Sequence, residues 1–440
     1  GEPVLDVLVV GAGQGGQAIA HALQRERIAN FLVIDRAPRD REGPWKTFAR
    51  MPTLRSWKTV TGPDLDIPAL TFQSWFEAQY GAAAFTAINK IPKGHWQDYL
   101  LWMRELLGMP VKNGVELLRV VPEEGLLAAD VREDGRESRL YARKVVLAMG
   151  IEACGGWFMP APIAALPPRF RAHSADDIDF TALRGKRVAV IGAGASAFDN
   201  GATALEQGAA SVALFCRRSE LQRTQPYKAI SFPGFLRHFA ELDDAMRWRF
   251  MLHLLDVREA FPVETWNRAT RHANFSLHTG SGVERCHVAG DAVELFTKSG
   301  THHVDFIICG TGVQLDVMRR PELAGLADKI ATWGDRFAAP AGETSARLAA
   351  FPYLGPGQVF TEKIPGTAPY LADIYCYDFG ATMSFGISGA SINAMKYAAP
   401  RIVSSISRDL FRADVERHWA TLAAYDEPEF PLTFARDALK

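Results

Sequence analysis

Two segments of the chain share one layout, a short apolar run followed by a cluster of glycines. They are VLDVLVVGAGQGGQAIA, residues 4–20, and RVAVIGAGASAFDNGA, residues 187–202. An apolar strand that passes through a glycine-rich turn into a helix is the arrangement that holds the pyrophosphate of a dinucleotide. Because 440 residues are too many for one compact core, the sequence predicts an α/β protein with two Rossmann-like dinucleotide-binding domains.

The first turn has the features of a site for a nucleotide with a free ribose. Gly11, Gly13 and Gly16 have GxGxxG spacing, and Gln14 lies within the turn. The three glycines permit the tight turn, the approach of the pyrophosphate and the packing of the helix on the strand, in that order. Asp35 ends the next expected strand, where a carboxylate accepts hydrogen bonds from ribose hydroxyls and repels a 2′-phosphate. We therefore expect FAD or NAD here.

The second turn differs at the position that contacts the ribose. Gly192 and Gly194 are followed by Ala197, an accepted replacement for the third glycine. Ser196 lies between Gly194 and Ala197. The next expected strand, residues 211–216, ends in Arg217 and Arg218, which suit a 2′-phosphate by charge and by paired hydrogen bonds. We expect NADPH here, so NADPH would deliver hydride to a bound FAD. The alternative is that these arginines are only a solvated strand end.

The order of the motifs predicts that the NADPH domain is nested within the FAD domain. Gly150 ends an apolar run that leads into a linker rich in glycine, proline and alanine, and DFIICGTG, residues 305–312, would carry the chain back. The closing helix is expected within residues 380–403. The predicted boundaries are 1–164 for the first part of the FAD domain, 165–315 for the NADPH domain with a helical insert at about 232–275, and 316–440 for the second part and the C-terminal tail. The insert is either a structural lid or a substrate-facing element.

Composition excludes several other classes of protein. The formal net charge is −1, so nucleic acid is not an expected partner. We find no long uninterrupted apolar run and no basic leader, and we expect a cytoplasmic protein that does not span a membrane. The five cysteines are scattered and form no CxxC pair, which argues against a metal site and a redox-active dithiol.

Further stretches resemble the class B flavin-dependent monooxygenases over about residues 4–405. These are EGPW (42–45), MPTLRSWKTVTGP (51–63), HWQDYLLW (95–102), LAMG (147–150) and CGTG (309–312). The resemblance implies FAD and NADPH as cofactors. In addition to the residues of the two turns, the cofactor contacts that we predict from it are Arg36, Trp45, Leu54, Gly150, Gly310, Thr311 and Gly312.

The chain departs from this group in one fingerprint, FxGxxxHxxxW or FxGxxxHSxxY. The matching segment is PPRFRAHSADDIDF, in which His173 and Ser174 fit. Pro167, Arg169 and Asp177 occupy the positions of the phenylalanine, the glycine and the final aromatic residue. Membership of a particular subgroup is therefore open. His173 is either a residue that senses NADPH or a linker histidine that hydrogen-bonds the backbone.

The resemblance implies a monooxygenase that inserts one oxygen atom from O2 into a small organic substrate through a C4a-(hydro)peroxyflavin. The reaction would be N- or S-oxygenation or a Baeyer–Villiger oxidation. A cation near the flavin would favour the deprotonated peroxide, and the candidates are Arg55 first and Lys58, then Arg223 and Arg268. A surface ion pair is the plain alternative for each of them.

Two other functions remain open from the sequence. An NADPH-dependent flavoprotein reductase without oxygen insertion would share both glycine turns. A nucleotide-binding redox sensor would need only one. The substrate and the oligomeric state are not readable, although a homo-oligomer is compatible with the sequence.

Overall fold

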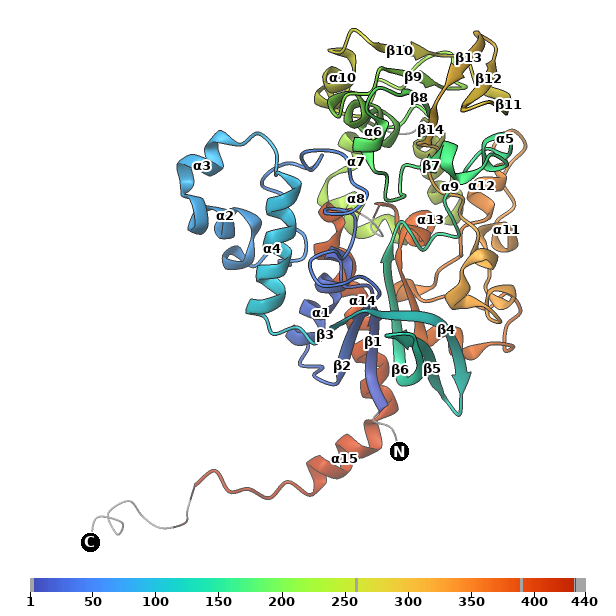
Figure 1. The fold of residues 1–440 in the computed structure, drawn as a ribbon. Helices are drawn as coiled ribbons and strands as arrows, with labels where there is room; N and C mark the ends of the chain where they lie inside the picture. Colours follow the sequence, from blue (N-terminus) through green and yellow to red (C-terminus); the bar gives the residue numbers. More distant parts are fainter. Residues whose placement is uncertain (1–3, 258–259, 388–390, 431, 433–440) are drawn as a thin grey trace.

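The computed structural model describes residues 4–257, 260–387, 391–430 and 432. Its first sheet has the order β3-β2-β1-β6-β5-β4, with β15 paired to β6. The four strands β3, β2, β1 and β6 and the added β15 pair in parallel, whereas β4, β5 and β6 form an antiparallel meander (Figure 1). The strands are β1 Val4–Val10, β2 Phe31–Asp35, β3 Val111–Asn113, β4 Val115–Glu123, β5 Leu126–Glu133, β6 Arg136–Gly150 and β15 Ile374–Asp378.

Helices from both ends of the chain cover one face of this sheet. The helix of the first glycine turn, α1 (Gln14–Arg25), packs against the long closing helix α14 (Ile392–Ala413), and both belong to one apolar core. The aromatic helices α2 (Phe72–Tyr80), α3 (Ala82–Ala87) and α4 (Lys93–Leu106) extend that core. The expected closing helix is thus present, and it returns to the domain in which the chain begins.

The second sheet has the order β10-β9-β8-β14-β7 and consists of parallel strands. Helix α6 (Ala195–Glu206) follows the second glycine turn, and a separate three-stranded meander, β11-β12-β13, packs beside the sheet. The strands are β7 Arg171–His173, β8 Arg187–Ile191, β9 Ser211–Phe215, β10 Phe275–His278, β11 Val283–Ala289, β12 Ala292–Thr297, β13 Gly300–Val304 and β14 Phe306–Cys309. We call the parts built on the two sheets domain 1 and domain 2.

The topology confirms the predicted fold class. All strands of the second sheet lie between β6 and β15, which are neighbours in the first sheet, so domain 2 is nested within domain 1. The two connecting segments pair with each other: the Phe158 amide donates to the Gly312 carbonyl at 2.8 Å, and the Gln314 amide donates to the Gly156 carbonyl at 2.8 Å. The exact domain boundaries stay predictions.

The helical insert predicted at 232–275 is not a single unit. Helix α8 (Pro233–His238) contacts α14, and α9 (Asp244–Val257) contacts α12 and α13, so both lie against domain 1. Helix α10 (Val263–Thr270) packs instead on α6, and the last residues of the range form β10. Shorter helices are α5 (Ala161–Ala164), α7 (Tyr227–Ile230), α11 (Trp333–Arg336), α12 (Ala346–Ala349) and α13 (Thr382–Phe385).

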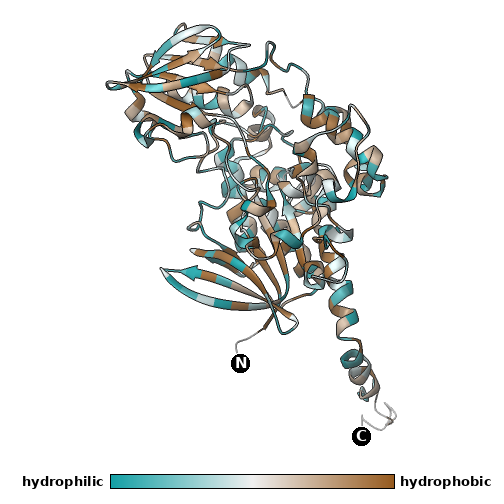
Figure 2. Cartoon of the chain, turned by 90° about the vertical axis from the view of Figure 1, so that its right-hand side faces the viewer, coloured by the Kyte–Doolittle hydropathy of each residue, from teal (hydrophilic) through white to brown (hydrophobic). Residues whose placement is uncertain are grey.

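The C-terminal part of the chain leaves the body of the molecule. After Asp414 the chain continues as α15 (Val415–Ala423), which projects away from both domains (Figures 1 and 2). Within the described residues, no helix combines the length and the apolar character that crossing a bilayer requires.

Candidate functional site

Three glycines of the first turn meet different surroundings. Gly11 has φ +102°, and a Cβ there would lie 2.4 Å from the Ala148 carbonyl oxygen. A Cβ on Gly16 would lie 1.7 Å from the Gly11 carbonyl oxygen, so both positions require glycine for the fold. A Cβ on Gly13 would meet nothing closer than Gly43, at 3.9 Å. Gly13 therefore leaves open space at the N-terminus of α1, where a pyrophosphate can approach the backbone.

The acidic residue at the end of β2 lies beside this opening. Asp35 accepts hydrogen bonds from the Ala12 and Ala37 amides, each at 2.7 Å, and burial raises the pKa of its carboxyl although both amides oppose the shift. Each oxygen keeps a further lone pair that can accept from a ribose hydroxyl. Gln14 is held by the Trp96 indole, which donates to its Oε1 at 3.1 Å.

Sequence reasoning missed a second carboxylate at this place. Glu42 is 3% exposed, and its Oε1 accepts from Arg104 at 2.8 Å and from Asn113 at 2.6 Å. Its Oε2 is buried without a hydrogen-bond partner among the described residues. Since Gly43 borders Gly13, Glu42 belongs to the surroundings of the first turn. The EGPW stretch was the available signal, although only Trp45 was selected from it.

The other predicted contacts of domain 1 lie in its core or at its edge. Trp45 and Leu54 are buried, and the Leu54 amide donates to the Ile91 carbonyl at 2.8 Å. Gly150 ends β6 with φ +67°. Arg36 is exposed and forms an ion pair with Glu152.

The second turn repeats the geometry of the first. Gly192 has φ +132°, and a Cβ there would lie 2.3 Å from the Gly310 carbonyl oxygen. A Cβ on Gly310 would lie 2.7 Å from the Ala197 Cα, which explains why both positions are small. At Gly194 a Cβ would meet nothing within 4 Å, so the backbone at the start of α6 is open. Ser196 donates through its hydroxyl to the Ser174 hydroxyl at 2.8 Å.

The two arginines after β9 have different surroundings. Arg218 donates to the carbonyls of Asp256, at 2.6 Å, and Val257, at 3.4 Å, and so contacts the C-terminal end of α9. Arg217 is exposed, and its side chain packs against Gly282. A Cβ on Gly282 would lie 2.6 Å from the Cγ of Arg217. Of the two side chains, Arg217 is therefore the better placed for a 2′-phosphate.

His173 ends β7 and is buried beside the two paired segments that connect the domains, which we call the hinge (residues 151–160 and 310–316). Its ring stacks on Trp157 at 4.9 Å between centroids, and its Nδ1 accepts from the Ala175 amide at 3.2 Å. Burial lowers the pKa of the imidazole, with Asp176 and the Gly312 backbone opposing the shift. A neutral ring that accepts at Nδ1 carries its proton on Nε2. The hydroxyl of Thr311 on the other hinge segment donates to the Phe158 carbonyl, and Gly312 has φ +79°.

The basic candidates separate into two groups. Asp199 on α6 is 2% exposed and accepts from Arg55 at 3.3 Å and from Arg268 at 3.4 Å, which brings two candidates together across the domain boundary. Burial raises the pKa of Asp199, and both arginines oppose this shift. Lys58 instead donates to the Phe85, Thr86 and Ile88 carbonyls at the end of α3. This placement of the Lys58 ammonium argues against its predicted catalytic role. The remaining candidate, Arg223, is exposed on the surface.

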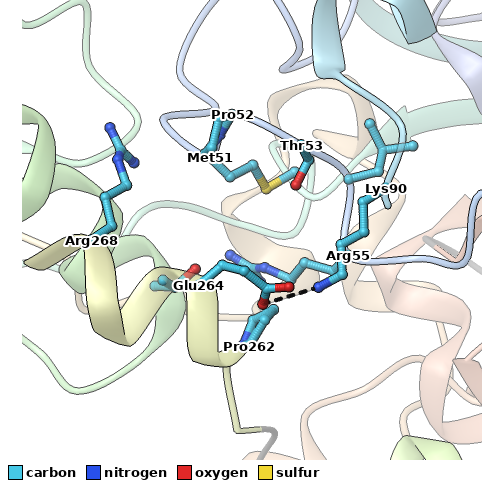
Figure 3. A pocket seen from close by; sticks show the side chains of 10 residues that line it. Met51, Pro52, Thr53, Arg55, Lys90, Pro262, Glu264 and Arg268 are labelled. Carbon is cyan, nitrogen blue, oxygen red and sulfur yellow. Dashed lines mark hydrogen bonds and ion pairs between the residues drawn. The ribbon is translucent and has the colours of Figure 1, made fainter. Parts of the chain in front are cut away.

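A pocket lies at the Arg55–Asp199–Arg268 group. Side chains of residues 51–55 and Lys90 face α10 across it, and Lys90 pairs with Glu264 at 3.3 Å (Figure 3). The lining residues are Met51, Pro52, Thr53, Leu54, Arg55, Lys90, Pro262, Glu264, Thr265 and Arg268. Within the described part of the chain, no three histidine, cysteine or acidic side chains gather as a metal site.

Known proteins are similar to this chain in sequence or in fold. The model of the pyridine nucleotide-disulphide oxidoreductase family matches residues 8–244. The FAD-dependent urate hydroxylase of Xanthomonas campestris pv. campestris is 41% identical over 433 residues, covering 97% of this chain and 90% of that protein. Among solved structures, the ornithine N-hydroxylase of Kutzneria sp. 744 has a TM-score of 0.71 at 17% identity, with 93% and 100% of the two chains covered. The L-lysine 6-monooxygenase of Pseudomonas syringae has 0.70 at 19%, with 92% and 99% covered.

The two glycine turns, the nested sheets and the paired hinge define an oxidoreductase with two dinucleotide-binding domains. The chain belongs to the pyridine nucleotide-disulphide oxidoreductase family, and the resemblance to flavin-dependent monooxygenases is confirmed. All five cysteines are free, and no two of them have CxxC spacing.

Proposed function

We propose that this protein is an FAD- and NADPH-dependent monooxygenase that hydroxylates a small planar anion of the purine class, with urate as the first candidate. The observation that carries the proposal is the 41% identity to the urate hydroxylase along nearly the whole of both chains. We propose that the oxygen atom is added to a ring carbon, and such a reaction differs from the N- or S-oxygenation and the Baeyer–Villiger oxidation expected from the sequence.

The residues of domain 1 fit FAD. The open backbone at Gly13 would hold the pyrophosphate, and Asp35 would accept hydrogen bonds from the ribose. The partnerless buried oxygen of Glu42 would gain a donor from the same part of the cofactor, since a buried acceptor without a partner is costly. When bound, FAD accepts hydride from the nicotinamide and activates oxygen. The chain's own residues bind it, orient it and exclude water.

Domain 2 fits NADPH through the open backbone at Gly194 and the cation of Arg217. We expect Arg217→Ala to raise the KM for NADPH by roughly 10- to 100-fold, because a charge-assisted hydrogen bond to phosphate is lost. Steady-state kinetics with NADH provides the control, since NADH lacks the 2′-phosphate and its KM should stay near the wild-type value. Equal losses with both cofactors would show that Arg217 acts on the fold and not on the phosphate.

The pocket between the domains supports an anionic substrate. Arg55, Lys90 and Arg268 contribute cations to its wall, where Glu264 pairs with Lys90, and the buried Asp199 accepts hydrogen bonds from both arginines. A guanidinium offers donors in one plane, which suits the edge of a flat heterocycle that carries carbonyl oxygens. The same contacts would orient the substrate and exclude water from the site. A smaller fraction of the reduced oxygen would then be lost as hydrogen peroxide.

Arg55→Met tests the site and the substrate class together. We expect the variant to raise the KM for urate by at least roughly 10-fold and to release a larger fraction of the consumed NADPH as hydrogen peroxide. NADPH consumption, urate loss and peroxide are measured in parallel, with Arg223→Met as the exposed control that should behave as wild type. If urate neither stimulates NADPH oxidation nor is consumed by the wild type, the substrate assignment fails. Rapid reduction of electron acceptors without oxygenation of urate, amines or ketones would favour the reductase.

A further inference from the structure

The C-terminal arm presents an apolar stripe that its own body does not cover. Phe411, Val415, Trp419 and Leu422 follow one another at spacings of three and four residues, so they lie on one side of the helical arm. They are 57%, 45%, 64% and 67% exposed, and no residue of α15, which is described throughout, is buried. Large side chains repeated on one face of a projecting helix mark an interaction site.

The direction of the arm is fixed at its base. Asp414, at the junction of α14 and α15, accepts two hydrogen bonds from Arg143 of β6, at 2.9 and 3.0 Å, and one from Arg417 at 2.8 Å. These arginines lower the pKa of Asp414 to about 2. The clamp holds α15 away from the body, as both ribbon views show (Figures 1 and 2). The two domains therefore leave the stripe uncovered.

The geometry points to a second copy of this chain, paired with the first through an antiparallel contact between the two arms. An identical arm brings an identical stripe, so apolar side chains meet apolar side chains about a two-fold axis near Trp419. Residues 419–430 contain Asp426, Glu427 and Glu429 and no basic residue, whereas residues 411–418 balance Arg412 and Arg417 against Asp414 and Glu416. An antiparallel pair about Trp419 places the acidic end of one arm beside this balanced part of the other, with Asp426 opposite Arg412, and a parallel pair would place both acidic ends together.

The size of the stripe is sufficient for a stable contact. With Tyr425, which follows α15 and is 62% exposed, the stripe exposes about 600 Å² per copy, so two copies would bury at most about 1,200 Å². This area reaches the lower limit of specific protein interfaces. A membrane surface is the less suitable partner, because helices that bind anionic lipid are basic on their polar face and this arm ends in three acids.

Light scattering on the size-exclusion column eluate of the full-length protein tests the proposal at about 10 µM. The wild type should have about twice the chain mass of 48.4 kDa, and Trp419→Glu/Leu422→Glu should have the mass of one chain. Met318→Glu/Ile364→Glu is the matched control, since these two side chains are each 63% exposed outside the arm. It should stay dimeric. A monomeric wild type or a dimeric arm variant would overturn the proposal. If the monomeric wild type also sediments with lipid vesicles and Trp419→Glu/Leu422→Glu does not, the stripe binds a membrane surface instead.

Crosslinking tests the orientation. A cysteine at His418, which flanks the stripe, would lie near the two-fold axis, whereas cysteines at Arg412 of the two copies would lie about 20 Å apart in an antiparallel pair. A short bismaleimide should therefore join two His418→Cys chains and leave Arg412→Cys chains separate, against the background of the wild-type cysteines. Equal crosslinking at both positions would contradict the antiparallel arrangement.

Discussion

Gly13→Ala is expected to give a folded protein that purifies without flavin. The backbone at Gly13 has φ −68° and ψ −171°, which any residue adopts, and the added Cβ would lie no closer than 3.9 Å to another part of the chain. The methyl group would instead occupy the space in which the pyrophosphate approaches the amides of α1. The flavin affinity should fall at least roughly 100-fold, because charge-assisted contacts to both phosphates lengthen together.

Two neighbouring glycines make this prediction specific. Gly15→Ala places its Cβ at 3.4 Å from the Tyr377 ring, an ordinary contact, and should keep its flavin. Gly16→Ala places its Cβ at 1.7 Å from the Gly11 carbonyl oxygen and should fail to fold. The flavin-to-protein absorbance ratio and the circular dichroism spectrum of each variant distinguish these cases. A yellow Gly13→Ala protein with wild-type flavin affinity would show that the dinucleotide does not pass this turn.

The parts of the fold that were predictable from sequence are those set by short-range patterns. Each strand and turn that begins a domain is encoded within about twenty residues, so β1, α1, β8 and α6 could be located directly. The nested topology followed from the order of the two turns. The β11-β12-β13 meander was missed because it carries no glycine motif. The helices of the predicted insert contact both domains, which a helical pattern in the sequence does not indicate.

The site was predicted less completely because its contacts join distant segments. Asp199 meets Arg55 and Arg268 only when the two domains lie together, and Glu42 meets Arg104 only through the placement of α4. Lys58 lies three residues after Arg55 in a segment selected for its resemblance, yet its ammonium binds carbonyls of the neighbouring helix. Sequence can indicate which side chains carry charge, but the partner that accepts each charge depends on tertiary packing.

Arg320→Met is expected to destabilise the protein by about 3–5 kcal/mol, because it leaves two buried carboxylates without a cation. Arg320 donates to Glu322 at 2.6 Å and to Asp378 at 2.8 Å, and the three side chains are at most 2% exposed. Burial alone would lower the pKa of Arg320, but both carboxylates together raise it well above its usual value. Because Asp378 ends β15, the group joins the returning chain to the central sheet of domain 1.

The matched control is Lys112→Met, which removes an equally short ion pair to Glu133 at 2.6 Å from the surface. It should cost less than about 1 kcal/mol, since exposed pairs contribute little. The deficit of Arg320→Met should also depend on pH. Without the guanidinium the buried carboxyls bind protons more tightly in the folded state than in the unfolded state, so the variant loses stability relative to wild type as the pH rises. Urea titrations should therefore give a larger free-energy deficit at pH 8 than at pH 5, and an equal deficit at both would mean that lost packing dominates over lost charge.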